Sequence, residues 1–61
     1  MMKLLHTILH HPTLYSEQRG EEDMIDLMAS EGLIHYVNLE YRSGWTITLK
    51  GIKKYRESTQ D

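Results

Sequence analysis

The first ten residues place apolar side chains at helical spacing. The i, i+3, i+4, i+7, i+8 pattern is formed by Met1, Leu4, Leu5, Ile8 and Leu9. This spacing puts the apolar residues on one face and predicts an amphipathic helix. Because a proline disfavours helical backbone in the residue before it, Pro12 predicts that the helix ends at His10 or His11.

A second helical stripe follows a short polar stretch. Its apolar positions are Met24, Ile25, Leu27 and Met28, and acidic residues fill its first turn. Acidic side chains suit the positive end of a helix dipole, so we expect a helix over residues 21–31. Gly32 is predicted to be the left-handed residue just past its end, with Leu33 folded back onto the last turn. Residues 13–19 are compatible with either a loop or a single helical turn.

Alternating apolar residues between positions 37 and 49 predict a β-hairpin. A three-residue loop, Arg42-Ser43-Gly44 with Gly44 left-handed, brings all of these apolar residues to one face. The predicted opposite pairs are Tyr41 with Trp45, Leu39 with Ile47 and Val37 with Leu49. The other face is polar, as expected of a sheet that is wet on one side.

The last element is predicted to be a helix capped by Thr48, where the strand pattern ends. Ile52 and Tyr55 then face the core, while four basic residues point outward. Residues 58–61 are expected to fray.

The length and the residue types restrict the class of protein. A chain of 61 residues forms one domain with a small core, which favours additional stabilisation by a homodimer. The absence of cysteine excludes disulfides and weakens any structural-zinc interpretation. The sequence contains no run of about 20 apolar residues that could span a membrane and no secretory signal, so we expect a cytoplasmic protein.

Charge is distributed unevenly along the chain, although the net charge is only −2. Residues 1–33 carry two basic and six acidic side chains, whereas residues 34–61 carry five basic and three acidic ones. A polyanion would therefore be attracted to the hairpin and the last helix and repelled by the middle helix.

Two segments carry a resemblance to a known family. The helix exit Glu31-Gly32-Leu33-Ile34 and the segment Ile47-Thr48-Leu49-Lys50-Gly51 resemble matching parts of MarR-type and PadR-type winged-helix regulators and small phage-related winged-helix proteins. The second segment corresponds to their Leu-Thr-x-Lys-Gly, with Ile47 in place of leucine. The resemblance covers roughly residues 21–57. It implies an α+β fold, a small winged helix with a two-stranded β-hairpin wing and a truncated second helix.

The resemblance implies a DNA-binding regulator, but the middle helix departs from that pattern. In DNA-binding members this helix presents polar and basic side chains to the major groove. Here its outward face is acidic, which opposes phosphate contact. DNA would instead meet the wing and the last helix, at Arg42, Trp45, Lys53, Lys54 and Arg56.

The alternative is a protein-interaction module, for example a phage or mobile-element protein that binds a host factor. Its partner face would be the acidic helix, formed by Glu21, Glu22, Asp23 and Asp26. An acidic surface of this kind also has a simpler explanation, since it matches the helix dipole and aids solubility. Likewise, Trp45 and Tyr41 could close the core instead of meeting a partner.

Catalysis and cofactor binding are not expected. His6 and His10 have the i, i+4 spacing of two metal ligands, but no acidic or cysteine partner is near them in sequence. We interpret them as part of a solvated helix face. No arrangement of serine, histidine and carboxylate residues indicates an active site, so we expect neither an enzyme, a metal nor a cofactor.

Overall fold

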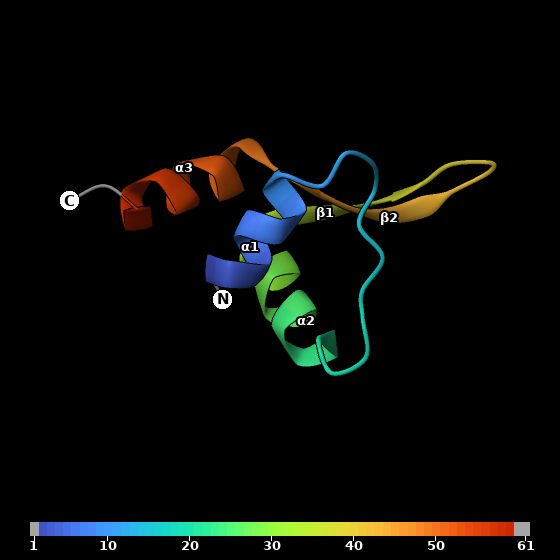
Figure 1. Cartoon of the computed structure of the whole chain (residues 1–61), viewed down its shortest axis with the longest axis horizontal. Coiled ribbons are helices and arrows are strands. Elements are labelled where there is room, and N and C mark those ends of the chain that lie inside the picture. Colours follow the sequence, from blue (N-terminus) through green and yellow to red (C-terminus); the bar gives the residue numbers. More distant parts are fainter. Residues whose placement is uncertain (1, 60–61) are drawn as a thin grey trace.

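The computed structural model describes residues 2–59. Within that range the chain forms α1 (Met2–Leu9), α2 (Glu22–Ser30), β1 (Ile34–Asn38), β2 (Ser43–Ile47) and α3 (Leu49–Thr59). The two strands pair antiparallel, so the predicted α+β class with a two-stranded hairpin is confirmed. The molecule is elongated, with extents of 40 × 21 × 18 Å. Figure 1 shows why: the hairpin projects to one side of α1 and α2, and α3 projects to the other.

A small apolar core joins α1, α2 and the start of the hairpin. α1 packs against β2 and α3, and α2 packs against β1. The buried side chains come from both helices, the connecting segment and the α2–β1 junction: Leu5, Ile8, Tyr15, Ile25, Met28, Leu33 and Ile34. The predicted amphipathic stripes of α1 and α2 thus supply four of these seven residues.

The end of α2 has the predicted glycine cap. Gly32 has a φ of 76°, and its N–H donates to the carbonyl of Ala29. The N–H of Leu33 donates to the carbonyl of Met28 at 2.9 Å. These two bonds form a Schellman motif, which fixes the direction of the chain as it leaves the helix. Leu33 and Met28 are both fully buried and belong to the same apolar core, as the hydrophobic part of the motif requires.

The hairpin pairs in a different register from the one predicted. Tyr36, and not Tyr41, lies opposite Trp45, and Ile34 lies opposite Ile47. The hairpin turns over residues 39–42, where the N–H of Leu39 donates to the carbonyl of Arg42 at 2.7 Å. Gly44 lies within β2 and is not left-handed, since the glycines with positive φ among the described residues are Gly20 and Gly32.

The physical reason for the difference lies at the start of β1. Ile34 directly follows the capped end of α2 and is 3% exposed, so it sets which face of the strand is buried. A one-residue change of phase reverses every side chain of a strand. The predicted apolar row therefore breaks up: Leu39 and Tyr41 are 54% and 91% exposed in the turn, and Leu49 is 82% exposed on α3.

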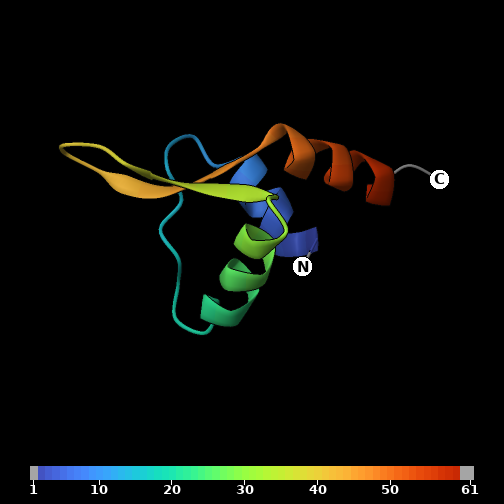
Figure 2. The same ribbon diagram turned by 180° about the vertical axis from the view of Figure 1, so that it is seen from behind.

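The expected truncated second helix is absent from the described residues: the segment between α1 and α2 forms no helix and instead adds a single bridge to the sheet, because Tyr15 pairs with Trp45. Tyr15 and Trp45 form an antiparallel bridge in which each residue donates its N–H to the carbonyl of the other. The close approach depends on Gly44, because a Cβ there would lie 2.7 Å from the carbonyl oxygen of Tyr15 and 2.8 Å from Cβ of Leu14. Figure 2 shows this connecting segment crossing the hairpin near its middle.

The start of α3 is tied to the end of α2. As predicted, Thr48 caps α3: its Oγ1 accepts a hydrogen bond from the N–H of Gly51 at 3.0 Å. The same hydroxyl donates to the carbonyl of Gly32 at 2.6 Å, with the carbonyl of Leu33 also within 3.0 Å. Tyr55 packs against the core as expected, and Ile52 is half-buried.

Candidate functional site

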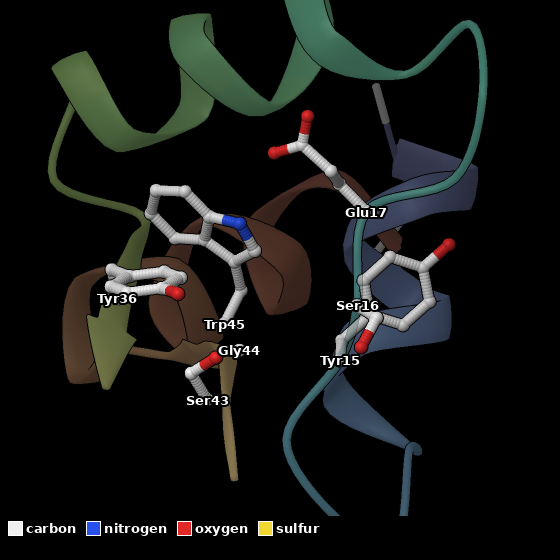
Figure 3. Close-up of a pocket in the computed structure, with 7 residues that line it drawn as sticks. All are labelled: Tyr15, Ser16, Glu17, Tyr36, Ser43, Gly44 and Trp45. Atoms are coloured by element: carbon white, nitrogen blue, oxygen red, sulfur yellow. The ribbon is translucent and has the colours of Figure 1, made fainter. Parts of the chain in front are cut away.

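A cleft opens where the connecting segment separates from β2. After the Tyr15–Trp45 bridge, the two segments no longer pair, and a space of about 320 Å³ remains between them. It is lined by Tyr15, Ser16, Glu17, Tyr36, Ser43, Gly44 and Trp45. In Figure 3, Glu17 extends from the connecting segment toward the side of the cleft occupied by the Trp45 indole.

Two aromatic rings form the hairpin side of this cleft. The centroids of Tyr36 and Trp45 are 5.1 Å apart in an edge-to-face arrangement. Such pairs add to the stability gained from burial alone. Tyr36 remains 47% exposed, and Trp45 is half-buried and packs against the core. Trp45 therefore closes the core, as considered from the sequence, and it also lines an open cleft.

The opposite wall is anchored by Tyr15. Its hydroxyl donates to Oε1 of Glu21 at 2.7 Å, and the N–H of Gln18 donates to the same oxygen at 2.8 Å. Burial raises the pKa of Tyr15 to about 12, and the hydrogen bond and negative charge of Glu21 act in the same direction. Tyr15 is therefore a neutral donor at physiological pH, which holds the connecting segment against α2.

The structure does not gather the five predicted nucleic-acid-binding residues on one surface. Arg42 lies in the hairpin turn, whereas Lys53, Lys54 and Arg56 are exposed on α3. Figure 1 places the hairpin turn and α3 at opposite ends of the molecule. Trp45 lies between them.

The predicted acidic face is largely present on α2. Glu22, Asp23 and Asp26 are exposed on the helix. Glu21 precedes the helix, and its carboxylate already accepts hydrogen bonds from Tyr15 and Gln18. Leu27 follows Asp26 on the same helix and is 49% exposed. An exposed leucine beside an acidic surface was not singled out from the sequence, where it was assigned to the core stripe.

His6 of α1 contacts α3. The ring of His6 lies 4.4 Å from that of His10, centroid to centroid, and its Nδ1 is hydrogen-bonded to the hydroxyl of Tyr55. This contact connects α1 to α3. Within residues 2–59, no group of three or more histidine, cysteine or carboxylate residues is arranged to hold a metal ion.

Sequence reasoning did not identify four residues of the cleft: Tyr15, Ser16, Glu17 and Tyr36. Tyr36 could have been found from its two-residue spacing to Ile34, whereas the positions of Tyr15 and Glu17 depend on contacts distant in sequence.

Comparison with known proteins gives no match: no family model fits the chain, and no curated protein or solved structure is significantly similar to it. Of the described helices, none has the length and apolar character needed to cross a membrane.

Proposed function

We propose that this chain is a reduced winged-helix module that binds a protein partner through the exposed face of α2. In this interpretation β1 and β2 are the wing. α2 directly precedes the wing and so occupies the position of the recognition helix.

The observation that carries the proposal is the chemistry of that helix. Its exposed residues Glu22, Asp23 and Asp26 would repel the phosphates of DNA, and a helix in the major groove meets phosphates on both sides. Leu27, which follows Asp26 on the same helix, adds an exposed apolar contact at the edge of this surface. Interfaces commonly combine apolar and charged contacts, so this face fits a protein whose own surface is basic.

Charge-neutral variants test the proposal. Glu22→Gln combined with Asp26→Asn keeps the size of the side chains and removes two charges from α2. Glu40→Gln combined with Glu57→Gln removes the same charge from the turn and α3. We expect affinity capture from the native cells to recover a partner with the wild-type chain and the control, and to lose it with the α2 variant and with Leu27→Ala. Capture that is equally strong with all four proteins would reject the α2 face.

DNA binding is the second candidate, and the exposed basic residues of α3 favour it. Lys53, Lys54 and Arg56 lie on one short helix, where they could contact phosphates without groove insertion. If this reading holds, the combined change of these three residues to alanine should weaken binding to all sequences and reduce its dependence on salt. Fluorescence anisotropy with duplex DNA at low and moderate salt measures both effects.

A further inference from the structure

The cleft beside β2 combines aromatic rings with hydrogen-bond acceptors. Tyr36 and Trp45 supply the rings, and Glu17 supplies a carboxylate from the other wall. The three side chains come from different segments and line the same opening, as Figure 3 shows.

The backbone of β2 adds a further acceptor. Trp45 directs its N–H and carbonyl away from β1, because both are bonded to Tyr15. In an antiparallel strand the residue two positions away directs its groups to the same edge. The N–H and carbonyl of Ser43 therefore face the cleft, where continued pairing would have placed Glu17 opposite Ser43.

The Glu17 carboxylate is free for an external group. The neighbouring Glu21 carboxylate already accepts hydrogen bonds from Tyr15 and Gln18, and that of Glu22 accepts one from the N–H of Gly20. Within the described part of the chain no comparable bond holds the Glu17 side chain, which is exposed. The cleft thus has a negative charge, and none of its lining side chains is basic.

We propose that this cleft binds the cationic side chain of an arginine or lysine in an extended peptide. A cation is attracted to the faces of tryptophan and tyrosine rings, and its N–H groups can donate to the Glu17 carboxylate and the Ser43 carbonyl. The apolar stem of the same side chain packs against the indole. The site lies beside β2 rather than on the exposed face of α2, so it does not depend on the proposed function of that helix.

Short peptides of matched shape test the cleft. The probes are N-acetyl-Ala-Arg-Ala-amide, its lysine equivalent, and the citrulline equivalent, which has nearly the shape of arginine without its charge. In a heteronuclear NMR titration, the single tryptophan of the chain gives one indole N–H signal that reports on the cleft directly. We expect that signal and the amides of Ser43 and Glu17 to shift with the charged peptides. Binding of the citrulline peptide should be weaker by about fivefold or more, since it loses the ion pair and the cation–π contact.

Two variants and one control separate this site from general charge attraction. Glu17→Gln and Tyr36→Leu should each weaken binding of the arginine peptide by about threefold to fivefold. Glu57→Gln changes the net charge equally on α3 and should leave the affinity unchanged. Unperturbed amide spectra of the free variants away from the cleft would show that the fold is kept. The proposal is overturned by equal binding of the arginine and citrulline peptides, by an unchanged affinity in Glu17→Gln, or by the absence of shifts at millimolar peptide.

Discussion

Gly51 is the residue whose substitution tests the packing of this fold most sharply. It is buried near the start of α3, where α3 passes the α2–β1 junction. An ideal Cβ at this position would overlap the carbonyl oxygen of Leu33 and lie 2.7 Å from Cγ1 of Ile47. A Cβ does not approach non-bonded atoms that closely, so Gly51→Ala requires α3 to move away from the junction.

The expected cost can be assembled from the contacts that would change. Helix propensity alone would make alanine more favourable than glycine by about 1 kcal/mol. Against this, overpacking a well-filled site costs about 1–3 kcal/mol. The movement also disturbs the hydrogen bond from the N–H of Thr48 to the Leu33 carbonyl and the approach of the Thr48 hydroxyl to that carbonyl, both at 3.0 Å. Hydrogen bonds of this kind contribute about 1 kcal/mol each. The net loss should be about 2–4 kcal/mol, a large part of the stability of a domain this small.

Urea unfolding followed by circular dichroism measures this loss. Lys54→Gly is the matched control, because Lys54 is exposed on the same helix and glycine there should cost about 1 kcal/mol through propensity alone. If glycine and alanine matter only through propensity, the two substitutions must change stability in opposite directions. A Gly51→Ala protein as stable as wild type, or more stable, would refute the packing of α3 against Leu33.

Three further predictions concern the supports of the cleft and the end of α2. Gly32→Ala should destabilise the domain by about 1 kcal/mol in chemical denaturation, because the left-handed φ of 76° disfavours a Cβ; an unchanged midpoint would show that the Schellman cap contributes nothing. Gly44→Ala should cost about 1–3 kcal/mol and weaken amide-exchange protection at Trp45, since its Cβ would meet Tyr15 and Leu14; retained protection would contradict the bridge. The raised pKa of Tyr15, about 12 when folded against an ordinary 10.0, means that its contribution to stability is complete below pH 10 and is lost as the pH rises toward 12. Tyr15→Phe should therefore flatten the alkaline part of the stability profile, and an identical profile in both proteins would exclude Tyr15 as its source.

The elements of the fold could be predicted because their signals are local. The stripe of α2, the glycine at its end and the threonine before α3 each act through residues a few positions away. The structure places the helix over Glu22–Ser30, one residue inside each predicted end, and confirms the roles of Gly32 and Thr48. Local hydrogen-bonding chemistry fixes such boundaries without knowledge of the rest of the chain.

The hairpin register could not be derived in the same way, because the sequence contains two apolar rows of opposite phase. Ile34 and Tyr36 form one row, and Val37, Leu39 and Tyr41 form the other. The longer row predicts the wrong pairing. The shorter row sets the pairing, since Ile34 leaves the α2 cap directly into the core and Tyr36, two residues on, lies opposite Trp45.

The cleft could not be predicted from the sequence for a related reason. Its walls are joined by the Tyr15–Trp45 bridge, which links positions thirty residues apart, and no periodic pattern marks Tyr15 as a strand residue. Gly44 is the one residue of the sequence that marks the place where the connecting segment meets β2. In the structure Gly44 allows the connecting segment to approach β2, because a Cβ there would collide with Tyr15 and Leu14. From the sequence, a glycine at this place predicts a left-handed turn residue, which Gly44 is not.

Site-specific photo-crosslinking in the native cells tests the role of the α2 face most directly. A photoreactive phenylalanine derivative replaces Leu27 on α2 in one protein and Lys53 on α3 in another; both positions are exposed. The proposed interaction module predicts a nuclease-resistant protein adduct from position 27 that disappears with Glu22→Gln and Asp26→Asn, and no adduct from position 53. A nuclease-sensitive adduct from position 53, with none from position 27, would contradict it and establish DNA as the partner.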